Sequence, residues 1–194
     1  MVSDHLRPYL LIATSTSLMW TGAICLADDP VEDRSPYAGQ ETRTLKSMSE
    51  DEVAAYLRGD GMGFAKLAEL NSYPGPRHVL DLADQLDLSD EQLASTEALF
   101  EEMRQQAITL GEQLVAAETR LDRAFAAGDV DAASLEAAML EIGEIRGRLR
   151  NVHLQAHLEQ KGILTPMQVR RYDMFRGYNS ADHEHKGHHG HTTK

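Results

Sequence analysis

Apolar residues recur three and four residues apart over two long stretches of the chain, which is the spacing of one face of an α-helix. In the first stretch, from Ser89 to about Ala127, the recurring positions are Leu93, Phe100, Met103, Ala107, Leu110, Leu114, Ala117 and Leu121. In the second, which ends at about Gly162, they are Leu135, Met139, Ile142, Ile145, Leu149, Val152 and Ala156. Because methionines at helical spacing usually belong to the core, we expect Met103 and Met139 to be buried.

The segment between the two stretches, AAGDVD over residues 126–131, supplies a glycine to end one helix and aspartates to cap the next. Two amphipathic helices joined by so short a turn pack against each other as an antiparallel hairpin. The pattern therefore predicts an all-α fold built on a long antiparallel helical hairpin.

Short helices are expected on both sides of the hairpin. Ser49 and Glu52 have the spacing of a capping box, and the helix that they start is interrupted by glycines at positions 59, 61 and 63. Residues 70–78 form a turn in which Pro76 suits the first position of a helix to about Leu86. A last short helix is predicted to end near residue 176.

One five-residue pattern occurs twice, as LSDEQ over residues 88–92 and as LTPMQ over residues 164–168. In each copy a hydroxyl residue suits the N-cap of a helix, and the glutamine three residues on can reach back to the backbone of that cap. The preceding leucine can pack against the next turn as a hydrophobic staple. The motif residues are Leu88, Ser89, Gln92, Leu164, Thr165 and Gln168.

The first residues have the form of a secretory signal, with Arg7 before an apolar run and small residues around Ala27, where we expect cleavage. An uncleaved anchor is the alternative, and Cys25 makes a lipoprotein the minority interpretation. The predicted organisation is a signal peptide over 1–27, a disordered linker over 28–48, a short helix and glycine/proline-rich turn over 49–75, an LTxxQ helical domain over 76–178 and a His-rich disordered tail over 179–194.

Composition narrows the classes of function. After cleavage the chain keeps no cysteine, so disulfides and thiolate ligands are excluded. The formal net charge of −12 argues against a nucleic-acid partner, and solubility also explains it. No nucleophile motif or phosphate-binding loop is present, so we do not expect an enzyme. No stable membrane insertion is expected once the signal is removed.

The paired pentapeptides, the hairpin, the signal and the His-rich tail together resemble the Spy/CpxP family of periplasmic LTxxQ proteins, which includes zinc-responsive ZraP-like members. The resemblance covers roughly residues 76–178. It implies a cradle-like dimer in the periplasm that acts as an ATP-independent chaperone for unfolding envelope proteins, or as an inhibitory partner of a sensor kinase. The long first helix is acidic, whereas Spy-like cradles tend to be basic on the client-binding face.

Methionines, aromatic residues and arginines are the residue types that we expect to contact clients. Thioethers adapt to irregular partners, and arginines attract acidic segments at long range. The candidates are Met62, Phe64, Met167, Met174, Phe175, Arg146, Arg150, Arg170 and Arg171. For the arginines the alternative is a solvated face that complements the acidic helix.

Histidines supply the candidate metal ligands. Five of the nine lie in the tail, at His183, His185, His188, His189 and His191. Imidazoles suit Zn²⁺, Cu²⁺ and Ni²⁺, although a polar tail of this composition also binds metals adventitiously. His153 and His157, four residues apart on the second long helix, are a further candidate pair, and a structural role is their alternative. We interpret His78 as structural.

The leading prediction is a periplasmic, metal-responsive chaperone or envelope-stress accessory protein that requires no cofactor. The alternative is a protein that binds or buffers zinc, copper or nickel, or inhibits a sensor, through its His-rich tail. A helical adaptor with neither activity is the third interpretation.

Overall fold

The computed structural model describes residues 35–178. Contacts within the chain divide it into two units, residues 1–38 and 39–194, which are described separately. In the first unit, residues 35–38 form a turn closed by the Ala38 amide, which donates to the Ser35 carbonyl over 2.9 Å. The predicted signal peptide and the five tail histidines lie outside the described residues.

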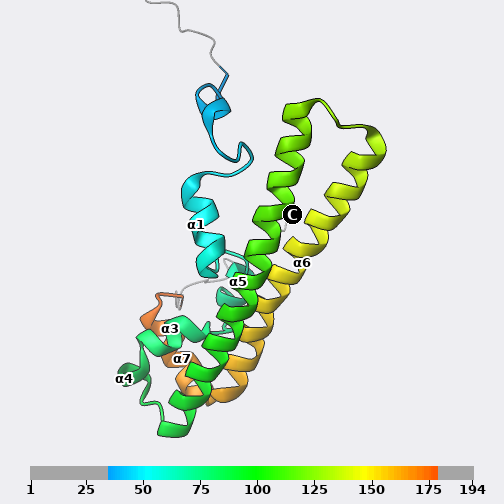
Figure 1. Ribbon diagram of the computed structural model, residues 1–194. Helices are drawn as coiled ribbons and strands as arrows, with labels where there is room; N and C mark the ends of the chain where they lie inside the picture. Colours follow the sequence, from blue (N-terminus) through cyan, green and yellow to red (C-terminus); the bar gives the residue numbers. More distant parts are fainter. Residues whose placement is uncertain (1–34, 179–194) are drawn as a thin grey trace, which may run out of the picture. The chain divides into compact units, whose positions relative to one another are not determined.

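Every regular element in the described residues of the second unit is helical, which confirms the predicted all-α class. In chain order the elements are the 3-10 helix η1 (Gln40–Thr42) and the α-helices α1 (Glu50–Arg58), α2 (Lys66–Glu69), α3 (Pro76–Asp81), α4 (Ala83–Leu86), α5 (Asp90–Ala127), α6 (Ala132–Ile163) and α7 (Pro166–Phe175). Helices α5 and α6 form the antiparallel hairpin, α1 packs along α5, and α3, α4 and α7 gather at the hairpin's open end (Figure 1).

The helix boundaries follow local chemistry. Ser49, Ser89, Asp131 and Thr165 each cap a helix, and in every case the N3 side chain accepts from the backbone of the cap to complete the box. Helix α5 ends at Gly128, which has the left-handed φ of 75° that such an end requires. The single helix expected from Pro76 to Leu86 is instead two short helices that meet at a break on Leu82.

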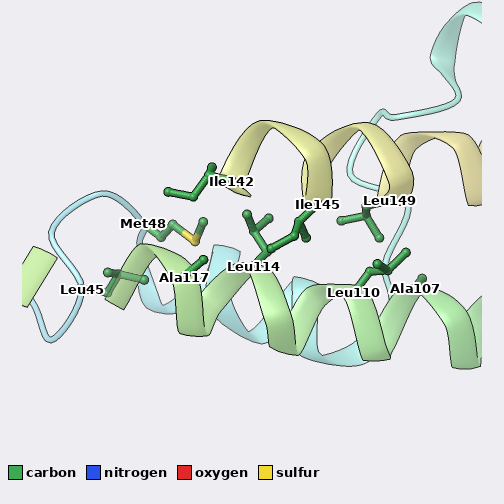
Figure 2. Packing of buried hydrophobic residues seen from close by; sticks show 9 residues of the cluster. All are labelled: Leu45, Met48, Ala107, Leu110, Leu114, Ala117, Ile142, Ile145 and Leu149. Atoms are coloured by element: carbon green, nitrogen blue, oxygen red, sulfur yellow. The ribbon is translucent and has the colours of Figure 1, made fainter. Parts of the chain in front are cut away.

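The main core lies along the seam between α5 and α6 (Figure 2). Its buried residues are Leu45, Met48, Ala107, Leu110, Leu114, Ala117, Ile142, Ile145 and Leu149. Met103 is also buried, as expected. Met139 is 51% exposed, so its prediction as a core residue was wrong: on α6 the buried cluster begins at Ile142, one turn after Met139.

The linker predicted over residues 28–48 ends earlier than expected. Leu45 and Met48 are buried in the core, and the Ser47 hydroxyl donates to Glu118 on α5 over 3.0 Å. Lys46 also pairs with Asp122 of α5 at 3.2 Å. These contacts fix the segment before α1 on the hairpin.

Helix α1 approaches α5 closely because α5 has a glycine at the crossing. A Cβ added to Gly111 would lie 2.3 Å from the Tyr56 carbonyl oxygen. No larger residue fits there without moving α1. Since α1 leads directly into the Met62 and Phe64 segment, this crossing positions two of the predicted client residues beside the hairpin.

Candidate functional site

The two copies of the pentapeptide meet at the open end of the hairpin. Each glutamine accepts a hydrogen bond from the backbone amide of its own cap, from Ser89 to Gln92 over 3.1 Å and from Thr165 to Gln168 over 2.9 Å. The two side-chain amides also pair with each other, because each Nε2 donates to the other's Oε1 over 2.9 Å.

Each paired amide also donates to a backbone carbonyl at the C-terminal end of a helix, which would otherwise lack a donor. Gln92 Nε2 donates to the Ile163 carbonyl over 2.9 Å, and Gln168 Nε2 donates to the Leu86 carbonyl over 3.2 Å. The amides therefore satisfy the last carbonyls of α6 and α4, which have no helical donor. The sequence predicted the two caps but not their pairing, because spacing within one pentapeptide says nothing of the other.

A second polar centre surrounds the buried carboxylate of Glu69. Its Oε1 accepts from the hydroxyls of Tyr172 (2.5 Å) and Tyr178 (3.0 Å) and from Arg176 Nε (3.2 Å). Burial and the hydrogen bond to Glu69 raise the pKa of Tyr172 well above its usual range. The centre thus holds the end of α7, and no motif in the sequence pointed to it.

The predicted histidine pair faces this centre and a neighbouring cavity. His157 Nδ1 lies 2.7 Å from the Tyr73 carbonyl oxygen and 3.7 Å from Glu69 Oε2. Because a carbonyl oxygen accepts only, the ring binds it through a proton on Nδ1, and Nε2 is the nitrogen on the opposite side of the ring. A Cβ added to Gly75 would lie 2.9 Å from that Nε2, so the glycine makes room for the ring.

His153 is buried, and its ring stacks on Phe64 with 5.8 Å between the centroids. Its Nε2 is buried without a hydrogen-bond partner in the described chain. Burial, with a smaller contribution from His157, lowers the pKa of His153 to about 4. The pair lines a cavity of about 340 Å³ that His78 and Met103 also line.

Four predicted client residues come together in one groove of about 440 Å³. Met62 and Phe64, from the loop after α1, face Arg146 and Arg150 of α6 across it. We call this the client groove. Arg146 also pairs with Glu118 at 2.8 Å, whereas Arg150 makes no ion pair within residues 35–178. The alternative of a charge-compensating face therefore describes Arg146 better than Arg150.

Met62 has a left-handed backbone, with φ of 41°. Residues other than glycine rarely adopt this conformation, because the Cβ crowds the following carbonyl. Such strained residues concentrate at functional sites. The side chain of Met62 is 40% exposed at the groove.

The other client candidates lie outside the client groove. Met167, Met174 and Phe175 are exposed on α7. Arg171 pairs with Asp87 at 2.9 Å, and Arg170 lines a separate groove with Lys161.

By fold and site, the described chain is therefore a protein of the helical-hairpin class. Two paired Leu-Ser/Thr-x-x-Gln motifs connect the start of α5 with the start of α7 at the open end of its hairpin. Residues 54–171 match the model of a family described as heavy-metal resistance, and the chain belongs to that family. This is the family of Spy/CpxP/ZraP-like LTxxQ proteins, so the resemblance is confirmed. Neither a curated protein nor a solved structure matches the chain.

Members of this family are typically periplasmic and are not known as enzymes. Within residues 35–178, no helix combines the length and the apolar character that a membrane crossing requires. The same part of the chain contains no group of three or more His, Cys, Asp or Glu residues that could hold a metal ion. His153 and His157 alone thus do not complete a metal site there.

Proposed function

We propose that the protein is a periplasmic, ATP-independent chaperone that binds unfolding envelope proteins as part of heavy-metal resistance. One observation carries the proposal: the fold brings Met62 and Phe64 beside Arg146 and Arg150 in a single groove. Apolar and thioether groups bind irregular apolar segments, while the unpaired Arg150 attracts acidic ones. A cradle-shaped homodimer, consistent with the family, would present two such grooves to one client.

The strained backbone of Met62 allows a clean test. Asparagine tolerates a left-handed conformation, so Met62→Asn removes the thioether without adding backbone strain. Burying a methionine side chain contributes roughly 1.5–3 kcal/mol, so the variant should bind clients about 10- to 150-fold more weakly. The measurement is suppression of aggregation of a reduced, unfolding client by the mature protein without nucleotide.

A matched control is Met174→Gln, which changes an exposed methionine on α7 outside the client groove. It should keep full activity. Arg150→Gln should weaken binding of acidic clients and reduce the salt dependence of binding, since it removes an unpaired cation. The proposal fails if the wild-type protein does not suppress aggregation, or if Met62→Asn and Met174→Gln behave alike.

A second candidate function, metal binding or buffering through the His-rich tail, is favoured by the family's link to heavy metals. The described histidines do not make a three-ligand site, so His183, His185, His188, His189 and His191 would have to supply most ligands for Zn²⁺, Cu²⁺ or Ni²⁺. A sensor kinase would be the partner of a regulatory form of this function.

Deletion of residues 182–194 separates the two candidates. If the tail binds the metal, its deletion should abolish tight binding of Zn²⁺, measured by calorimetry, and should lower metal tolerance. Suppression of client aggregation should stay intact. Substitution of His153 and His157 by alanine, compared with the deletion, measures what the helix pair adds. Unchanged calorimetry after the deletion would exclude the tail as the site.

A further inference from the structure

A second groove runs along the hairpin seam, and half of its lining residues carry side-chain amides. Its volume is about 620 Å³, and the five amide residues are Gln105, Gln106, Gln113, Asn151 and Gln155. We call it the amide groove. It has one cation and no carboxylate, although the chain carries 31 acidic residues.

Several of these amides are available to a ligand. The side-chain amides of Gln113, Asn151 and Gln155 make no hydrogen bond within residues 35–178. Gln105 and Gln106 donate to Glu101 and Glu102 on the same helix, over 2.7 Å and 3.2 Å. Both of these bonds are exposed and exchange readily for others.

Gly147 connects the amide groove with the client groove, because it lines both. A Cβ added to Gly147 would meet nothing within 4 Å, so packing does not require a glycine there. Glycine nevertheless weakens a helix relative to other residues. Its effect at this point is to lower the ridge of α6 between the two grooves.

We propose that a bound client crosses α6 over Gly147, with apolar side chains in the client groove and its extended main chain hydrogen-bonded by the amide groove. This inference rests on the proposed function, since the occupant is the same unfolded polypeptide. A side-chain amide donates and accepts as a peptide group does, so it binds a main chain whatever the client's sequence.

The dimensions and charges of the amide groove fit this occupant. The α5 residues that line it, 105–113, span about 12 Å along the helix, which matches three to four residues of extended chain. An unfolded segment has free N–H and C=O groups, whereas a folded helical partner has already paired them. A second copy of this chain would also bring a net charge of −12.

Two glycines of α6 provide a matched pair of variants. Gly143 is exposed, its added Cβ would likewise meet nothing within 4 Å, and it lines neither groove. Gly143→Gln and Gly147→Gln should each raise Tm by about 2 °C, because glutamine favours a helix more than glycine does. Gly147→Gln alone should weaken client binding, by about tenfold.

The probe is a short, labelled, unstructured peptide of Leu, Ala, Ser and Thr with one Asp, followed by fluorescence anisotropy. A counterpart with the same side chains and alternate backbone nitrogens methylated should bind about tenfold more weakly to the wild-type protein, since it lacks those donors. In Asn151→Leu with Gln113→Leu, the two peptides should bind alike.

The inference is overturned if Gly147→Gln binds the peptide as tightly as Gly143→Gln, or if methylation leaves the wild-type affinity unchanged. Loss of binding in Met62→Asn with none in Gly147→Gln would leave the proposed function standing and reject the crossing. No binding of either peptide to the wild-type protein would overturn both.

Discussion

The paired glutamines of the two motifs make a prediction about stability that can be worked out bond by bond. Gln168 is buried; its Nε2 donates to Gln92 and to the Leu86 carbonyl, and its Oε1 accepts from the Thr165 backbone amide. A hydrogen bond contributes about 1 kcal/mol net, and a buried group left unpaired costs about 1–3 kcal/mol. Gln168→Ala should therefore lower the free energy of unfolding by about 3–4 kcal/mol.

A double-mutant cycle isolates the contact between the motifs. Gln92→Ala also removes the bond to the Ile163 carbonyl, so it should cost about 2–3 kcal/mol. The reciprocal pair contributes two hydrogen bonds, so the double variant should lose about 2 kcal/mol less than the sum of the single variants. Urea unfolding followed by circular dichroism at helix wavelengths measures all four free energies.

Gln105→Ala is the control, because the Gln105 side chain is exposed and, in the described chain, bonds only Glu101 on its own helix. It should change the free energy of unfolding by less than about 0.5 kcal/mol. Strict additivity of the Gln92 and Gln168 substitutions would refute the coupling. A loss of less than about 1 kcal/mol in the free energy of unfolding for Gln168→Ala would refute the conclusion that the paired motifs stabilise the fold.

Two further predictions concern the residues around α1. The pKa of His153 is lowered from 6.5 to about 4, so the unfolded chain binds this proton more tightly than the folded chain does. Protonation of His153 therefore favours unfolding. The free energy of unfolding should keep its full value above pH 6.5 and should fall by about 3 kcal/mol as the pH drops to 4. His153→Phe should remove that part of the pH dependence in urea titrations, whereas His78→Ala should retain it. Gly111→Ala places a Cβ 2.3 Å from the Tyr56 carbonyl oxygen and should lower the free energy of unfolding by more than about 2 kcal/mol. Gly162→Ala is the control: its Cβ meets nothing within 4 Å, so it should raise Tm slightly. Equal Tm values for the two variants would contradict the close packing of α1.

Features that depend on local spacing could be predicted from the sequence. Both long helices begin within a residue of the predicted caps, because helix caps and apolar spacing depend only on residues that are close in the sequence. Features that depend on distant partners could not. Leu45 and Met48 stand among charged residues without periodicity, and their burial follows from the position of the hairpin against which they pack.

The candidate site divides in the same way. Methionine and arginine were predicted as client residues from their chemistry, but which of them share a groove depends on the crossing of α1 and α5 at Gly111. Glu69 was missed because its partners Tyr172, Arg176 and Tyr178 are more than one hundred residues away in the sequence. A lone glutamate before a turn carries no local signal of such a centre.

The paired glutamines of the motifs lie apart from the two grooves, and this separation decides how motif variants should be interpreted. Gln92 and Gln168 join the hairpin's open end, whereas the two proposed grooves meet at Gly147 on α6, and neither lining includes a motif residue. A motif variant should therefore lose client binding only in proportion to the fraction of chains that unfold. Adding an osmolyte should then restore binding in Gln168→Ala but not in Met62→Asn, since only the first defect lies in the folding equilibrium.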